Sequence, residues 1–171
     1  MSLLLTNIIF HGLIFAFILT VYLLIVMVAV SPRVWAFSDY PKTITNHVPP
    51  QTKSERRKGA VVAVPFFVLG IAFPYLSTLL LEGLYGGALP ILDAFLNVFG
   101  IWMFGFMADL LILDLLIVGT ITPNFVIIPG TEHMKNKEYK DFRLYHTKGH
   151  LKGLLLLGIL SLILAALVVF L

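Results

Sequence analysis

The stretch GFMADLLILDLLIVG, residues 105–119, decides the fold class. It is an almost unbroken apolar run that carries two aspartates, Asp109 and Asp114. On a helix in water these two acids need no explanation, but inside lipid each costs several kcal/mol unless something neutralises it. The surroundings of this helix therefore determine what the two carboxylates do.

The composition indicates an integral membrane protein. Of the 171 residues, 59% are hydrophobic and only 12% are charged, and the mean hydropathy is +0.97. That charged share is about half of the usual value for a soluble domain. A chain of this size cannot bury so much apolar surface inside a small globule. The absence of cysteine excludes disulfides, thiolate metal sites and a cysteine nucleophile.

Four apolar stretches predict four transmembrane helices, because about 20 helical residues cross roughly 30 Å of hydrocarbon. They cover residues 4–30, 60–84, 89–121 and 151–171. Gly86 and Gly87, followed by Pro90, predict a tight hairpin between the second and third. We therefore expect an all-α four-helix transmembrane bundle that forms a single domain over residues 1–171. In the stretch KNKEYKDFRLYHTKGH, aromatic residues near one face predict a short interfacial amphipathic helix on the cytoplasmic side.

The distribution of charge predicts the topology. All 12 Lys and Arg lie in or at the edge of the two polar segments 31–59 and 122–150, six in each. The positive-inside rule places both segments in the cytoplasm and both termini outside. We expect a multi-pass protein of a bacterial or archaeal inner membrane, with the bilayer as its first partner and anionic lipid at the basic face.

Other partners are less defined by the sequence. A second copy of the chain or a partner membrane subunit remain as alternatives. The net charge of +3 does not indicate nucleic acid, because no basic helix or RNA-binding signature accompanies it.

Three short phrases carry a family resemblance: LDLLI (113–117), FVIIPGTEHM (125–134) and EYKDFRLYHTKG (138–149). With them, residues 105–153 resemble an uncharacterised family of bacterial four-span membrane proteins that have an aspartate-bearing third span and a PGTE-M motif. The rest of the chain is similar in layout only. The resemblance implies the four-span architecture but no mechanism. It marks as family-pattern positions Asp109, Asp114, Glu132, Asp141 and His146.

The two aspartates are the first candidates for chemistry. At 1.5 Å per residue, Asp114 lies about 10 Å and Asp109 about 18 Å inside the predicted end of the span at Ile121. Five residues apart on an α-helix they point about 140° away from each other, which predicts that they do not form a paired site by themselves. Each either bonds a neighbouring helix or serves a function. We expect Asp114 to be the functional acid and Asp109 the more structural one.

His146 and His150 are four residues apart, so on a helix they share a face and can bind one metal ion. A third ligand would come from a carboxylate, for which Glu132 and Asp141 are candidates beside the two aspartates. The alternative is a pair of interfacial histidines. Glu132 also has a simpler explanation, since Pro129-Gly130 predicts a turn and Thr131 a helix cap. The sequence does not identify a cofactor.

A second group of polar residues lies near the opposite ends of the predicted helices. It is either a packed polar cluster or the outer mouth of a cation or proton route. Its members are His11, Glu82, Asp93 and Asn97.

No nucleotide-binding, nucleophile-elbow or zinc-protease motif is present in the sequence. Three functional classes remain. The first is a small membrane protein with an acidic, cytoplasm-facing intramembrane site for a cation, a proton or a lipid-linked ligand, and this is the one we favour. The second is a membrane enzyme that acts on a lipid-soluble substrate with an Asp/Glu/His site. The third is a non-catalytic accessory subunit of a membrane complex.

Overall fold

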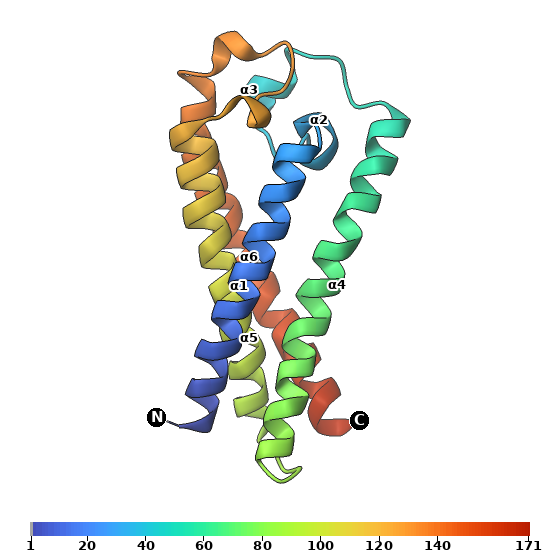
Figure 1. The fold of residues 1–171 in the computed structure, drawn as a ribbon, viewed down its shortest axis with the longest axis vertical. Helices are drawn as coiled ribbons and strands as arrows, with labels where there is room; N and C mark the ends of the chain where they lie inside the picture. The colour runs from blue at the N-terminus through green and yellow to red at the C-terminus, as the bar shows by residue number, and fades with distance from the viewer. Residues whose placement is uncertain (1) are drawn as a thin grey trace.

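The computed structural model describes residues 2–171, except the side chains of residues 142–144, and these residues form helices and no strand (Figure 1). The helices are α1 (Leu3–Ala29), α2 (Pro32–Trp35), α3 (Lys42–Thr45), α4 (Lys53–Leu84), α5 (Ile91–Ala108), the π-helix η1 (Asp109–Ile121), the short 3₁₀ helices η2 (Asn124–Val126) and η3 (Glu132–Met134), and α6 (Glu138–Phe170). The chain is an all-α bundle, as the sequence predicts.

Four helical segments are long and apolar enough to cross a membrane: α1, α4, α5 continued by η1, and α6. The predicted interfacial helix is wrong in one respect. Residues 138–150 do not form a separate short helix, because α6 runs without interruption from Glu138 to Phe170. Gly149 is the only helix-weakening residue in this part, and a glycine costs about 1 kcal/mol, too little to end a long apolar helix.

The connections follow the chemistry of their residues. Gly86 and Gly87 have φ of 73° and 81°, a left-handed conformation that makes the hairpin between α4 and α5. Thr52 begins α4 with a capping box, in which its hydroxyl accepts from the Glu55 amide and the Glu55 carboxylate accepts from the Thr52 amide. The hairpin lies at the same end of the bundle as both termini (Figure 1).

Close contact between α1 and α5 depends on small residues. A Cβ added to Gly105 would lie 2.6 Å from a ring carbon of Phe15, and one added to Gly100 would lie 2.7 Å from a side-chain carbon of Ile8. At Gly70 on α4 nothing lies within 4 Å of the added Cβ, so that glycine is not needed for close packing. Glycines at a helix interface let the backbones approach, which is how membrane helices gain packing energy.

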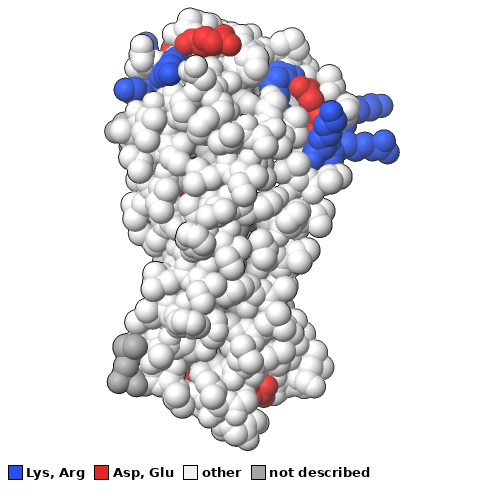
Figure 2. Space-filling model, viewed as in Figure 1, with Lys and Arg blue, Asp and Glu red and all other residues white. Residues whose placement is uncertain are grey.

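The two polar segments close one end of the bundle, where Lys and Arg side chains gather on the face in Figure 2. We call this the basic end. The Tyr40 hydroxyl of the first segment donates to Val126 O of the second at 2.6 Å, and within the second segment the Tyr139 hydroxyl accepts from Ile128 N at 2.8 Å. The two rings pack edge to face, with 5.7 Å between their centroids. The segments thus form a packed cap over the helices.

The third span changes its backbone hydrogen bonding halfway. It is α-helical to Ala108 and a π-helix from Asp109 to Ile121. Its last bond, from Thr122 N to Ile117 O at 2.8 Å, joins residues five apart. Most π-helical segments are single turns inside α-helices, and they are frequent at functional sites. This one is 13 residues long, begins at Asp109 and contains Asp114.

Candidate functional site

The π-helix places the two aspartates on one side of the third span. In a π-helix residues five apart lie almost above one another, whereas in an α-helix they diverge. The expected divergence of about 140° between Asp109 and Asp114 assumed an α-helix, but this part of the third span is a π-helix. The expectation that the two acids do not form a paired site by themselves stays a prediction. Both carboxylates contact the same residue, His150 of α6.

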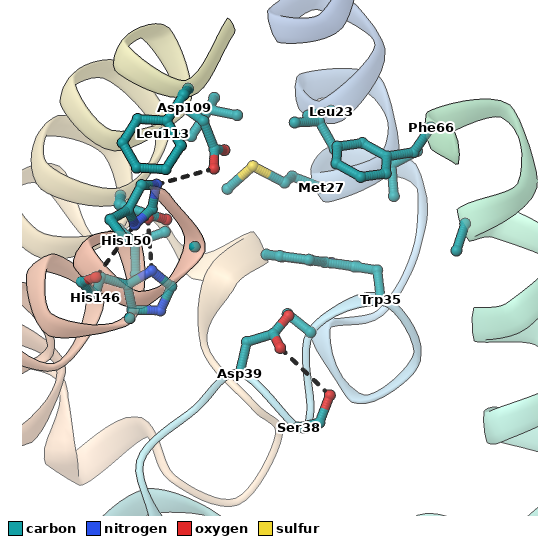
Figure 3. Close-up of a pocket in the computed structure, with 18 of the residues that line it drawn as sticks. Leu23, Met27, Trp35, Ser38, Asp39, Phe66, Asp109, Leu113, His146 and His150 are labelled. Atoms are coloured by element: carbon teal, nitrogen blue, oxygen red, sulfur yellow. Dashed lines mark hydrogen bonds and ion pairs between the residues drawn. The ribbon is translucent and has the colours of Figure 1, made fainter. Parts of the chain in front are cut away.

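Four side chains from η1 and α6 form a continuous polar cluster (Figure 3). His146 Nδ1 lies 2.6 Å from Asp114 Oδ2, and His150 Nδ1 lies 3.5 Å from the same oxygen. His150 Nε2 lies 3.3 Å from Asp109 Oδ2. We call Asp109, Asp114, His146 and His150 the Asp/His cluster. The i, i+4 spacing of the histidines gives them a common face on α6, as the sequence predicts.

The Asp/His cluster forms one wall of a cavity of about 850 Å³ at the basic end, between the four long helices. The opposite walls are mainly apolar and aromatic and come from α1, the segment after α2, and α4. Figure 3 shows Met27, Trp35 and Phe66 across from the cluster. The cluster, in which Asp114 is buried and the other three residues are partly exposed, thus faces a space large enough for a small organic molecule rather than a packed core.

The cavity opens sideways between α4 and α6. Phe67 on α4 and Leu156 on α6 both line it, and they are 60% and 58% exposed. Phe67 is nine residues beyond Lys58, so the opening lies about 13 Å along α4 from the last basic residue of that helix. This part of its rim is therefore on the apolar flank of the bundle, while Ser38, Tyr145 and Lys148, which also line the cavity, are exposed at the basic end.

Asp39 is a cavity residue that the sequence reasoning missed. It follows α2, and Ser38 Oγ donates to its Oδ1 at 3.4 Å. Asp39 is exposed, but the protein around it removes part of the water near its carboxyl, which raises the pKa of that group; His146 opposes this rise, and the nearby Asp114 adds to it. The only local signal was a carboxylate inside the aromatic run WAFSDY, and the fold of the segment over the cavity could not be read from that run.

Two predicted site residues lie elsewhere. Both Glu132 carboxylate oxygens accept from Gly130 N, at 3.0 Å each, and this bonding lowers the pKa of the exposed Glu132 carboxyl. The structure thus agrees with the predicted turn at Pro129-Gly130, but Thr131 as a side-chain cap is wrong, because its hydroxyl donates to Ile128 O and makes no cap bond to η3. Asp141 is exposed in the first turn of α6. Neither residue lines the cavity.

The predicted outer group separates into unconnected parts. Asn97 belongs to a buried network, which we call the Asn97 network: it accepts from Asn7 Nδ2 at 2.8 Å and donates to Thr78 Oγ1 at 3.0 Å, while Asn7 Nδ2 also donates to Ser77 Oγ at 2.9 Å. Asp93 instead accepts from the Tyr85 hydroxyl at 2.9 Å.

The two remaining members of that group make other contacts. His11 packs edge to face against Phe10 and Phe73. Glu82 uses its backbone carbonyl to close the end of α4 by accepting from Gly87 N at 3.0 Å. The four residues therefore do not form one outer mouth in the structure.

The Asp/His cluster also meets a geometric requirement for metal binding. Asp114, His146 and His150 each offer one ligand atom, and these atoms lie within 4.8 Å of one another. No protein-family model, curated protein or solved structure matches this chain. The family resemblance of residues 105–153 therefore stays a prediction, and the argument for function depends on the site itself.

Proposed function

We propose that this protein binds an amphiphilic, lipid-linked ligand in the cavity, with the ligand's apolar chain between α4 and α6 and its anionic head group near the Asp/His cluster. The observation that carries the proposal is the combination of an apolar wall, a polar wall and a lateral opening in one cavity of about 850 Å³. Sites for small molecules usually have this character: mostly apolar, with a few placed polar groups.

The apolar chain has a defined place. Phe66 and Phe67 of α4 and Leu156 and Leu157 of α6 line the side of the cavity that faces the flank. These side chains would contact an acyl chain that stays partly in the bilayer, so binding would not require the chain to cross water. Their exposure without a ligand costs little in lipid, where the surroundings are equally apolar.

The head group would meet positive charge. Lys148 and Lys152 of α6 also line the cavity. Lysines at the polar boundary of a membrane attract anionic lipid and phosphate groups. The proposed site lies at the basic end, which we expect to face the cytoplasm from the positive-inside rule.

A second candidate function is a membrane enzyme that acts on the same class of ligand. The pair of Asp114 and His146, 2.6 Å apart at the cavity wall, supports it. A carboxylate that orients an imidazole is a common arrangement for general acid–base catalysis. Glu132, which the sequence reasoning included in this site, takes no part. Incubation of the protein with lipid vesicles, followed by mass spectrometry of the lipids, would detect a product that His146→Gln does not form.

The binding proposal can be tested by fluorescence, because the chain has two tryptophans and Trp35 lines the cavity. In a Trp102→Phe background, phosphatidylglycerol brominated on its acyl chain should quench Trp35 strongly at low lipid fractions. Ala63→Phe, which fills the cavity from α4, should reduce that quenching. Leu76→Phe, at an exposed site on α4 outside the cavity, is the matched control.

The result also depends on the head group. Brominated phosphatidylcholine should quench less than phosphatidylglycerol at equal fraction, and Lys148→Gln with Lys152→Gln should remove the difference. If Ala63→Phe and Leu76→Phe change the quenching equally, Trp35 contacts only the surrounding lipid, and the proposal is wrong.

A further inference from the structure

His150 is surrounded by oxygen atoms on both of its ring nitrogens. Nδ1 lies 3.1 Å from the backbone oxygen of His146 and 3.5 Å from Asp114 Oδ2, and Nε2 lies 3.3 Å from Asp109 Oδ2. A neutral imidazole carries one N–H and can donate to only one side. The position therefore favours a cation, which is either a proton on His150 or a metal ion beside it.

We propose that Asp114, His146 and His150 bind one divalent transition-metal ion, and that Asp109 is a positioning residue that orients His150. The inference goes beyond the proposed lipid binding and does not depend on it. It is based on the positions of four side chains, on the composition of the ligand set and on the cavity beside it.

The ligand atoms are close to the separations that a metal requires. Two ligand atoms of a tetrahedral zinc ion, each about 2.1 Å from it, lie roughly 3.4 Å apart. His150 Nδ1 and Asp114 Oδ2 are 3.5 Å apart, and all three ligand atoms fit within 4.8 Å. The contact of 2.6 Å between His146 Nδ1 and Asp114 Oδ2 has to lengthen by less than 1 Å, which a rotation of the carboxylate achieves.

Asp109 completes the arrangement around the ion. A histidine that binds a metal through one ring nitrogen almost always donates its other N–H to a carboxylate or carbonyl. If His150 binds through Nδ1, its Nε2–H donates to Asp109 Oδ2, which is 3.3 Å away. The π-helix makes this arrangement possible, because it places Asp109 and Asp114 on the same side of the third span.

The chemistry of the ligands restricts the metal. Two imidazole nitrogens and one carboxylate oxygen, without sulfur, suit zinc and the neighbouring first-row ions better than magnesium or calcium. Three protein ligands beside an open cavity leave a further coordination position, as in sites that bind a substrate oxygen. A bound cation would also balance the carboxylates at the wall where we place an anionic head group.

The test measures metal on the purified full-length chain in detergent, without any lipid ligand. After treatment with a chelator and return of one equivalent of zinc or cobalt, the wild type should retain about one ion per chain through gel filtration. The cobalt form should show the visible absorption bands of a tetrahedral or five-coordinate site with nitrogen and oxygen ligands. His146→Gln and His150→Gln should lose both the ion and the bands.

Two further variants separate the roles. Asp109→Asn should keep the cobalt bands but weaken metal affinity by about 10–100-fold, the usual effect of losing a partner of a ligating histidine. His133→Gln, an exposed histidine outside the cluster, should bind like the wild type and controls for adventitious binding. A cooperative thermal unfolding transition, measured for each variant without metal, would show that the variant is folded.

Wild-type protein that retains no zinc or cobalt, or an ion that remains in folded His146→Gln, would overturn the metal site. In the first case the cation beside Asp109 and Asp114 is a proton on His150. Quenching of Trp35 by brominated lipid can succeed or fail independently, so failure of the metal site and failure of the lipid site are distinguishable.

Discussion

Replacing Asn97 by leucine tests whether the Asn97 network is structural or part of a route across the membrane. Asn97 is fully buried, and the substitution removes two good interhelical bonds, to Asn7 at 2.8 Å and to Thr78 at 3.0 Å. Both partners keep another bond: Asn7 Nδ2 still donates to Ser77 Oγ, and Thr78 Oγ1 still donates to Pro74 O. The substitution therefore removes these bonds and leaves one of the two N–H groups of the Asn7 amide without its acceptor.

The expected loss of stability follows from the two interhelical hydrogen bonds that the substitution removes. Interhelical side-chain bonds in membrane proteins contribute about 0.6 kcal/mol on average, and buried bonds in general up to about 1.5 kcal/mol. Asn97→Leu should therefore lower the free energy of unfolding by about 1–3 kcal/mol. The measurement is reversible unfolding in mixed micelles by increasing the fraction of sodium dodecyl sulfate. Leu92→Ala, at a 62% exposed position on the same helix, should change it by much less.

The same variant should leave the cavity unaffected. Between the Asn97 network and the cavity lies a packed apolar layer that includes Phe15, Ile101 and Trp102. Quenching of Trp35 by brominated lipid in Asn97→Leu should equal that of its parent. Unchanged stability together with lost lipid or metal binding would refute this reasoning and would restore the outer-mouth interpretation.

Three other predictions concern packing, pH and topology. Gly105→Ala should cost about 1–3 kcal/mol, because the new methyl group would lie 2.6 Å from Phe15 and α1 has to move; the same micelle titration measures it. Because the pKa of Glu132 is lowered in the folded chain, its ionised form stabilises the fold above the ordinary pKa of glutamate, and this is lost as the pH falls through the lowered value. Glu132→Gln should therefore lower Tm slightly at pH 7, and its difference from the wild type should shrink as the pH falls below the ordinary pKa of glutamate. In this cysteine-free chain, Gly86→Cys should react with an impermeant thiol reagent from outside intact cells and Asn136→Cys only after lysis, and the reverse pattern would invert the topology.

The architecture was predictable because it depends on composition and length. Apolar runs of more than 20 residues, a GlyGly hairpin and two basic segments are local features that need no knowledge of packing. The start of α6 was not predictable in this way. A polar, aromatic stretch before an apolar one has the same pattern whether the helix breaks at Gly149 or continues through it, and the choice depends on how the cap packs on Tyr139.

The candidate site was partly predictable. The spacing of His146 and His150 placed them on one face, and the cost of buried acids singled out Asp109 and Asp114. Their common contact with His150 was missed because it depends on backbone bonds between residues five apart in the third span, which no side-chain pattern reports. Asp39 was missed for another reason: it reaches the cavity only because a segment distant in sequence folds back over the helices.

The sideways opening at Phe67 and Leu156 determines in which unit the concentration of the proposed ligand has to be expressed. A ligand that enters from the bilayer is dissolved in a two-dimensional solvent, so occupancy of the site follows the ligand's mole fraction among lipids rather than its molarity in the sample. Adding detergent or empty vesicles at a constant total amount of ligand lowers the ligand's mole fraction in the lipid phase, and the occupancy of the site falls. Titrations in nanodiscs of fixed lipid number would report one dissociation constant, and titrations in micelles would report a value that rises in proportion to the detergent.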